Sequence, residues 1–321
     1  MNVNNLNTNE GKRIAIRAKL GSLAGYLVKL CSIMKIHVAD SRNFVQFSQT
    51  QNSAGKELKT MEGMAEERVL RGEKTQYNIC NYSNMDYASF WEDHNRKYED
   101  NVERIALRRL ACDISGTCLE IGAGYGRLVN EYARLCSDVL LIDYAPNLLD
   151  QARIRVERLG LGNARCMKAN LYDLSLLGKK YNTAICIRVM HHVENVPDFF
   201  KQVNLSLEDN GTFILEYANK KNVVEILRYL FKRPNIKPFD CLPSKRGDGV
   251  FYNFHPDYIR DMLIQNGFII EKEMAVSIFR NEFLKRIINY KILSKIESFL
   301  QKPLGCFHLS PSVLLKARKE R

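Results

Sequence analysis

Three glycines follow a short apolar run and form the segment of the sequence best suited to approach a cofactor. The run Thr117–Ile121 predicts a strand, and it leads directly into Gly122, Gly124 and Gly126. Glycine permits a tight turn and a close approach of backbone to ligand. The loop could be an ordinary strand-to-helix turn or a dinucleotide site. A dinucleotide fingerprint reads G-x-G-x-x-G, and Arg127 occupies the position of its third glycine, so the loop need not bind a pyrophosphate.

One carboxylate is placed to cooperate with this loop. Asp143 follows the apolar run Val139–Ile142 and lies 19 residues after Gly124. An aspartate at a strand end often caps a helix or forms a turn. Downstream of a glycine loop, however, its two oxygens can accept hydrogen bonds from both hydroxyls of a ribose. The pair therefore predicts a nucleoside site.

Strand-like and helix-like segments alternate around these residues, which favours a parallel sheet with helices on both faces. The expected strands are Thr117–Ile121, Val139–Ile142, Tyr181–Val189, Thr212–Tyr217, Phe268–Val276 and Ser312–Lys319. The expected helices are Lys97–Ala111, Arg127–Leu135, Asn147–Leu159, Pro197–Leu207 and Pro256–Gln265.

Four motifs in this order resemble the class I S-adenosylmethionine-dependent methyltransferases. They are Leu119–Gly126, Leu141–Asp143, Tyr181–Val193 and Asn210–Tyr217. The flanking segments at Trp91–Asp100 and Glu216–Lys220 resemble a less characterised prokaryotic branch of that family. The resemblance implies a Rossmann-like, seven-stranded, mostly parallel sheet and S-adenosyl-L-methionine as cofactor.

The resemblance also implies which residues bind the cofactor. The glycine loop would face the methionine part, Asp143 the ribose, and Tyr144 the adenine. Asn170 stands where relatives often carry an aspartate, and an amide oxygen accepts a hydrogen bond more weakly than a carboxylate. The full set is Glu120, Gly122, Ala123, Gly124, Gly126, Asp143, Tyr144, Asn170, Leu171 and Arg188.

Methyl transfer from a sulfonium depends mainly on positioning, so the sequence need not contain a fixed catalytic set. A general base is needed only for an acceptor that is protonated at the working pH. The candidates are His191, His255 and Tyr217, while Glu216 and Asn219 are expected on the substrate side. Adjacent helical positions point in different directions, so His191 and the next histidine are not expected to bind a metal together. No metal site is predicted.

The chain divides into an expected extension and a catalytic domain. Residues 1–80 predict a partly helical extension, and residues 81–321 predict the methyltransferase domain with helical insertions at about 221–254 and 277–309. Residues 281–302 predict one amphipathic helix. Its expected apolar stripe is Leu284, Ile288, Ile292, Ile296 and Phe299. This helix could pack on its own domain, or it could cover a lipophilic acceptor and contact a membrane surface.

Composition limits the remaining possibilities. Residues 221–321 hold 19 basic and 10 acidic side chains, but no RNA-binding motif accompanies this charge, so a nucleic-acid partner is not favoured. Nine cysteines without a Cys-x-x-Cys pair, and the absence of a long apolar stretch, favour a reduced cytoplasmic protein. The function predicted is methyl transfer to a small or lipophilic acceptor. The alternative is a catalytically silent cofactor-binding module that regulates or scaffolds a partner.

Overall fold

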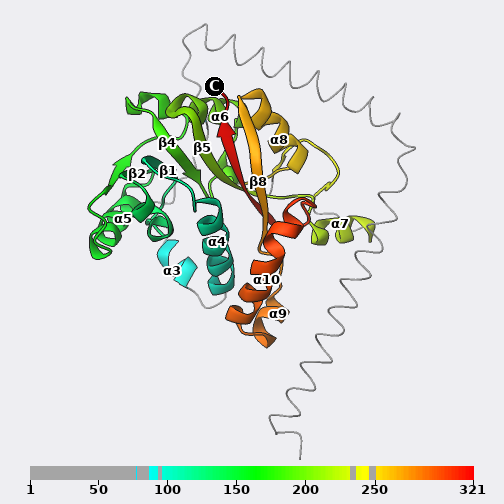
Figure 1. Ribbon diagram of the computed structural model, residues 1–321. Helices are drawn as coiled ribbons and strands as arrows, with labels where there is room; N and C mark the ends of the chain where they lie inside the picture. Colours follow the sequence, from blue (N-terminus) through cyan, green and yellow to red (C-terminus); the bar gives the residue numbers. More distant parts are fainter. Residues whose placement is uncertain (1–76, 78–86, 93–95, 232–235, 246–250) are drawn as a thin grey trace, which may run out of the picture. The chain divides into compact units, whose positions relative to one another are not determined.

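A seven-stranded sheet organises the protein (Figure 1). The computed structural model describes Tyr77 and residues 87–92, 96–231, 236–245 and 251–321. The chain divides into two units, residues 1–75 and 76–321, and every described residue belongs to the second. The predicted extension at 1–80 thus lies outside the described residues, except for Tyr77.

The strand order is β3-β2-β1-β4-β5-β9-β8. The first five strands in this order run parallel, whereas β9 pairs antiparallel with both β5 and β8. The prediction of a Rossmann-like, mostly parallel sheet is therefore confirmed. The strands are β1 (Thr117–Ile121), β2 (Asp138–Asp143), β3 (Ala164–Lys168), β4 (Tyr181–Cys186), β5 (Leu207–Ala218), β8 (Phe268–Val276) and β9 (Ser312–Lys319).

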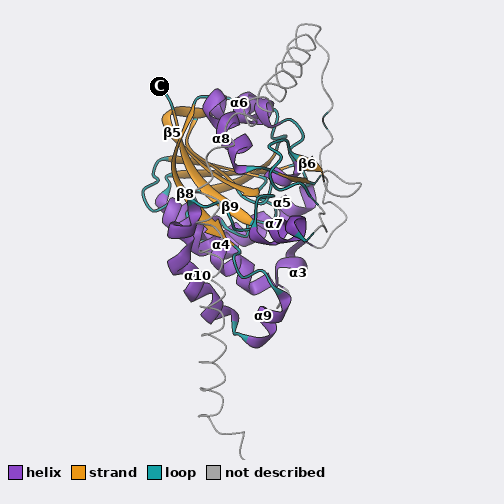
Figure 2. Cartoon of the chain, turned by 90° about the vertical axis from the view of Figure 1, so that its right-hand side faces the viewer, coloured by secondary structure: helices purple, strands orange, loops and turns teal. Residues whose placement is uncertain are grey.

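Helices cover both faces of the sheet (Figure 2). On one face α4 (Lys97–Leu110) and α10 (Tyr290–Gly305) pack against each other, and α5 (Pro146–Arg158) packs against β2 and β3. On the other face lie α6 (Val196–Ser206) and α8 (Pro256–Gln265), and a cluster of buried phenylalanines joins α6 to β5 and β8. This cluster is Phe199, Phe200, Phe213 and Phe268.

Asparagine side chains begin several of these helices. Asn195 caps α6 by accepting a hydrogen bond from a backbone N–H of the first turn, as Asn222 does for α7 (Val223–Leu230). Asn281 caps α9 (Glu282–Ile287) and Asn289 caps α10 in the same way. Such caps satisfy backbone donors that have no partner inside the helix, so the local sequence fixes where these elements start.

The segment after the glycine loop differs from the prediction. A helix was expected over Arg127–Leu135, but the chain forms two short 3₁₀ turns, η3 (Val129–Glu131) and η4 (Ala133–Leu135). The side chain of Arg127, at the start of this segment, is buried and bonds Glu103 on α4. The remaining short elements are α3 (Tyr87–Glu92), η5 (Leu174–Leu177), η6 (Met190–His192), β6 (Ser244–Lys245) and β7 (Tyr252–Asn253).

The two insertions are only partly as expected. The first contains α7 but also the paired strands β6 and β7. The second contains two helices instead of one, because the backbone is extended at Ile288 and Asn289 caps a new helix. The expected apolar stripe is partly wrong: Ile292 and Phe299 are exposed, whereas the buried face of α10 is made of Leu293, Ser294, Glu297, Gln301 and Gly305.

This buried face of α10 packs on α4 and β8, which supports the packing role over the cover. No helix among the described residues is both long and apolar enough to cross a bilayer. The seven cysteines in this part of the chain are all free thiols.

The contact between α10 and β8 gives a first prediction. A Cβ added at Gly305 would lie 2.2 Å from the backbone oxygen of Glu273, and backbone atoms cannot move aside cheaply. Gly305→Ala should therefore destabilise the protein by about 1–3 kcal/mol in urea unfolding.

Gly162→Ala is the matched control, because a Cβ there meets nothing within 4 Å. Its effect should stay within about 0.5 kcal/mol. Equal stability of the two variants would contradict the close packing of α10.

Candidate functional site

The glycine loop closes tightly after β1. Gly122, Gly124 and Gly126 have φ values of 68°, 55° and 70°, a region that strains residues with a side chain. A Cβ at Gly122 would also lie 2.3 Å from a methyl carbon of Val189, in the loop that follows β4. The backbone conformation therefore requires glycine at these alternating positions, and at Gly122 there is also no room for a side chain.

Asp143 holds this loop from the end of β2. One carboxylate oxygen accepts the N–H of Gly124 at 2.8 Å and the other accepts the N–H of Ala145 at 2.9 Å. Burial raises the pKa of Asp143 above its ordinary value, and these backbone donors partly oppose the shift. The N–H of Tyr144 also contributes, and a carboxylate has about four lone-pair sites, so Asp143 can still accept a hydrogen bond from a ligand.

The loop offers few free backbone donors. The N–H of Ala123 bonds Ile142 and the N–H of Gly126 bonds Ala123, in addition to the bond between Gly124 and Asp143. A pyrophosphate site needs several such N–H groups pointing at the ligand. The loop therefore fits a cofactor without phosphate better than a dinucleotide.

The residues expected around the adenine lie at the ends of β2 and β3. Tyr144 follows Asp143 and is partly exposed, with the Lys168 ammonium 5.3 Å from its ring centre. The side-chain oxygen of Asn170 already accepts the N–H of Tyr172 at 3.0 Å, which closes a turn next to Leu171. The amide nitrogen of Asn170 is not used in that turn.

Glu120 is directed away from solvent. Its carboxylate is buried and accepts the hydroxyl of Tyr132 at 2.5 Å. Burial raises the pKa of Glu120 to about 7. The observed role of Glu120 is thus to fix η3 and η4 under the loop, and its predicted contact with a cofactor stays a prediction.

A buried carboxylate connects the loop with the end of β4. Glu103, on α4, accepts Arg127 Nη2 at 2.7 Å and Arg188 Nε at 2.6 Å. Burial would raise the pKa of Glu103, but Arg188 and Arg127 outweigh it and hold the pKa below its ordinary value. Trp91 stacks on both guanidinium groups.

Arg188 was expected beside the methionine part of the cofactor. It lies at the end of β4, next to β1, but its side chain is committed to Glu103. Its φ of 63° is unusual for arginine, and its N–H donates to Glu216 at 3.1 Å. Strained backbone of this kind persists only where surrounding bonds hold it.

A cavity of about 390 Å³ adjoins this network. Its walls come from α3, the loop after β4, the end of β5, α7 and the turn after β8. Aromatic rings of Phe90, Trp91 and Phe251 line it together with polar side chains. The strand β4 is the neighbour of β1, and Glu103 joins the lining residue Arg188 to Arg127, the residue that follows the glycine loop.

Strand alternation separates two of the expected substrate residues. Glu216 faces α4 and accepts from Arg188, while Tyr217 faces the opposite side and is fully buried. Burial raises the pKa of Tyr217 well above its ordinary value, which makes it a poor base. Asn219 lines the cavity, but its amide donates to the backbone oxygens of His308 and Ser310.

His191 is the catalytic candidate that lines the cavity. Its ring stacks on Phe251 with centroids 4.6 Å apart and on His192 at 4.0 Å. The expectation that the two histidine rings point apart was wrong, because the tight 3₁₀ turn η6 brings them together. Burial, followed by the charge of His192, lowers the pKa of His191 well below its ordinary value, so its imidazole is neutral at pH 7.

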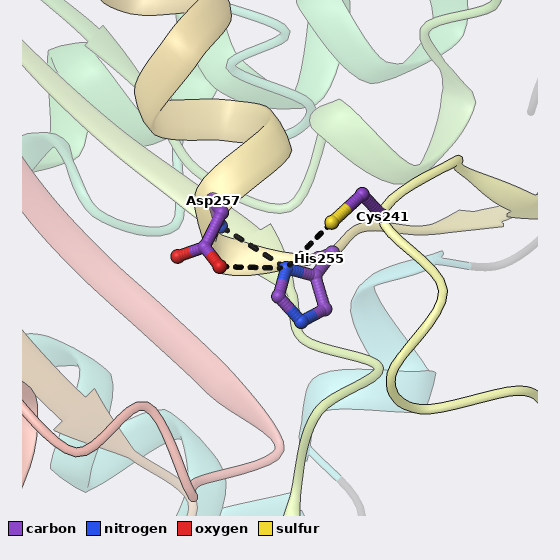
Figure 3. Close-up of side chains that lie close together, drawn as sticks. All are labelled: Cys241, His255 and Asp257. Atoms are coloured by element: carbon purple, nitrogen blue, oxygen red, sulfur yellow. Dashed lines mark hydrogen bonds and ion pairs between the residues drawn. The ribbon is translucent and has the colours of Figure 1, made fainter. Parts of the chain in front are cut away.

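His255 does not line the cavity; it caps α8. Its Nδ1 accepts the N–H of Asp257 at 3.2 Å and lies 3.9 Å from the sulfur of Cys241 (Figure 3). Potential ligand atoms of these three residues lie within 4.8 Å of one another. The Nδ1 lone pair is used by the helix cap, and burial lowers the pKa of His255 to about 4. The arrangement is explained by capping, and the prediction that the chain holds no metal stays untested.

Several residues of the site carried no recognisable signal in the sequence. Glu103 reads as an ordinary helical acid, and Arg280 as a surface arginine between two predicted elements. Phe251 and Asn253 belong to a segment expected to be helical. The one available clue was the position of Glu103 beside the apolar face of the helix predicted over Lys97–Ala111, and the sequence analysis did not use it.

The known proteins that this chain resembles are methyltransferases. Residues 90–273 match the family model described as a methyltransferase domain. An uncharacterised methyltransferase of Schizosaccharomyces pombe is 25% identical over 182 residues, covering 55% of this chain and 68% of that protein. A ubiquinone biosynthesis O-methyltransferase of Bradyrhizobium diazoefficiens is 26% identical over 126 residues. The match covers 39% of this chain and about half, 47%, of that protein.

The fold is shared with solved structures as well. A crystal structure assigned to an S-adenosylmethionine-dependent methyltransferase of Listeria monocytogenes superposes with a TM-score of 0.52. It is 16% identical, and the match covers 70% of this chain and 99% of that one.

The buried carboxylate gives the second prediction. Glu103→Gln leaves Arg188 without its charged partner and should cost about 3–5 kcal/mol of stability. Because the pKa of Glu103 is lowered, its ionised carboxylate stabilises the folded protein at neutral pH. This stabilisation is lost as pH falls through the lowered pKa. Thermal unfolding at pH 7 measures the effect.

Glu157→Gln, an exposed change on α5, is the control and should alter stability by less than about 0.5 kcal/mol. A comparable small change in Glu103→Gln would show that the ion pairs contribute little.

Proposed function

The chain belongs to the methyltransferase-domain family and is an S-adenosylmethionine-dependent methyltransferase, and on this premise we propose that it methylates a small molecule bound in the cavity beside the glycine loop. The observation that carries the proposal is the adjacency of β1 and β4. The loop and Asp143 follow β1 and β2, whereas the cavity is lined from the ends of β4 and β5. Reactants held at such a junction need only be aligned for transfer.

The roles proposed for the cofactor residues come from the family resemblance, and the geometry of the loop is compatible with them. Asp143 would accept the ribose hydroxyls with the lone pairs that the loop leaves free, and Tyr144 would flank the adenine. Gly122 and Gly124 would let the methionine part approach the backbone. When bound, the cofactor supplies an electrophilic methyl group on a sulfonium. The protein residues then have to bind, align and exclude water.

The size of the cavity supports a small-molecule acceptor. A volume of about 390 Å³ falls within the usual range for ligand sites, roughly 300–1,000 Å³. Its lining combines aromatic rings with a few polar groups, as such sites generally do. The relative from Bradyrhizobium is named for ubiquinone biosynthesis, which also fits a small acceptor.

His191 is the group best placed to accept a proton from the acceptor. It lines the cavity, and its neutral imidazole can take a proton that an acceptor hydroxyl releases. Tyr217 and His255 are less suited, since one is buried on the other side of β5 and the other caps α8.

The function is tested by incubating the full chain with labelled cofactor and a small-molecule extract. Labelled product together with S-adenosylhomocysteine supports the proposal. Cofactor binding without any labelled product would favour the silent binding module.

Asp143→Ala should weaken S-adenosylmethionine binding at least about tenfold in calorimetric titration. The change removes hydrogen bonds to the ribose and also the anchor of Gly124, and a factor of ten is about 1.4 kcal/mol. Asp150→Ala, an exposed change on α5, should bind normally. Unchanged affinity in Asp143→Ala would contradict the ribose assignment.

His191→Phe keeps a ring against Phe251 but removes the nitrogen atoms. It should lower kcat with the identified acceptor by about 10²-fold and leave the cofactor Kd unchanged. Because the pKa of His191 is lowered, activity of the natural chain should stay level from about pH 8 to 6.5 and fall only in more acid solution.

The control is His192→Phe, which changes the neighbouring ring outside the cavity lining and should retain kcat within about threefold. A fully active His191→Phe enzyme would show that no proton passes through this residue.

A further inference from the structure

The charge of the cavity lining is unbalanced. Four arginines contribute to it, and the described lining contains one acid, Glu225. Glu225 is paired with Arg228 at 2.6 Å, and Arg188 is held by Glu103 behind the wall. Two of the four positive charges are therefore neutralised by carboxylates.

The other two, Arg96 and Arg280, have no carboxylate partner among the described residues. The Arg96 guanidinium lies 4.3 Å from the ring centre of Phe90, which holds it without neutralising it. Burial lowers the pKa of Arg280 below its ordinary value, and the charges of Arg188 and Arg96 lower it further, while the more distant carboxylates of Glu99 and Glu103 oppose the shift only in part. Arg280 still retains an exposed surface, so it lies within the cavity and in contact with solvent.

The turn that carries Arg280 is fixed by α4 and α10. The buried carboxylate of Glu297 accepts the N–H groups of Ser277 and Ile278 at 2.8 and 2.9 Å. The hydroxyl of Tyr98 accepts the N–H of Phe279 at 2.8 Å. Arg280 therefore starts from a rigid backbone, which reduces the entropic cost of using it to hold a ligand.

A further polar group in the lining has no partner among the described residues. Asn253 is 8% exposed, and its buried side-chain Nδ2 makes no hydrogen bond to the part of the chain that the structure describes. Buried donors of this kind are rarely left without an acceptor. A ligand oxygen in the cavity would provide one.

We propose that the acceptor molecule carries an anionic group, a carboxylate or a phosphate, which Arg280 and Arg96 bind while its apolar body contacts Phe251. This inference rests on the proposed function, because it names the chemical class of substrate for the same cavity. Guanidinium groups suit both anions, since their planar N–H donors match pairs of oxygens. The body of the molecule would then extend past Asn253 toward His191 and the loop after β4.

The test uses three probes with the full chain saturated with S-adenosylhomocysteine: benzoate, phenyl phosphate and the neutral benzamide. At least one of the two anions should bind about tenfold more tightly than benzamide in calorimetric titration. The tighter anion distinguishes carboxylate from phosphate. Arg280→Met should abolish this preference, whereas Arg286→Met, which removes an equal charge from α9 outside the cavity, should change it by less than about threefold.

Two results would overturn the inference. One is benzamide binding as tightly as both anions, or no saturable binding of either anion up to about 10 mM. The other is an Arg280→Met variant that keeps the full preference. S-adenosylhomocysteine affinity is measured for every variant. If the natural chain does not bind S-adenosylhomocysteine, the proposed function is refuted. If it binds S-adenosylhomocysteine normally but shows no preference for the anions, only the anionic acceptor is refuted.

Discussion

The carboxylate of Glu103 is the constraint on which the site depends. It is completely buried and lies between the guanidinium groups of Arg127 and Arg188. Removing a charged carboxylate from water costs free energy, so the site forms only if both arginines pair with Glu103. One arginine belongs to the turn after β1 and the other to the loop after β4. A single helical residue thus ties together the segments that follow β1 and β4.

The same network explains how the chain departs from a dinucleotide fold. A glycine in place of Arg127 would let a helix pack closely on the sheet. The arginine instead turns toward α4, and two short 3₁₀ turns replace the helix. Asp143 then takes the N–H of Gly124, so the loop keeps few donors for phosphate oxygens.

The acceptor side is built from segments that are distant in the sequence. The end of β5, the helix α7 and the turn after β8 meet around one cavity. Glu297 and Tyr98 rigidify that turn from two helices, and so the lining depends on the packing of α10. The insertion near the C-terminus thus contributes by supporting the wall. Its exposed apolar residues, such as Phe299, take no part in the cavity.

The sequence by itself determined the class of fold and half of the site. Alternating strand and helix periods predict the sheet, and Gly122, Gly124 and Gly126 are required by local backbone conformation, so their role can be read locally. The edge strand β3 was not predicted, because its polar residues Arg165 and Lys168 interrupt the apolar pattern. The face of α10 was misjudged, since Glu297 and Gln301 are buried by partners on α4 and β8 that periodicity cannot reveal.

Tertiary structure alone decided the pairing of Glu103 with Arg188, 85 residues apart, and the placement of Arg280 in the cavity. Long-range ion pairs leave no local signal, because either residue alone has the composition of an ordinary exposed surface.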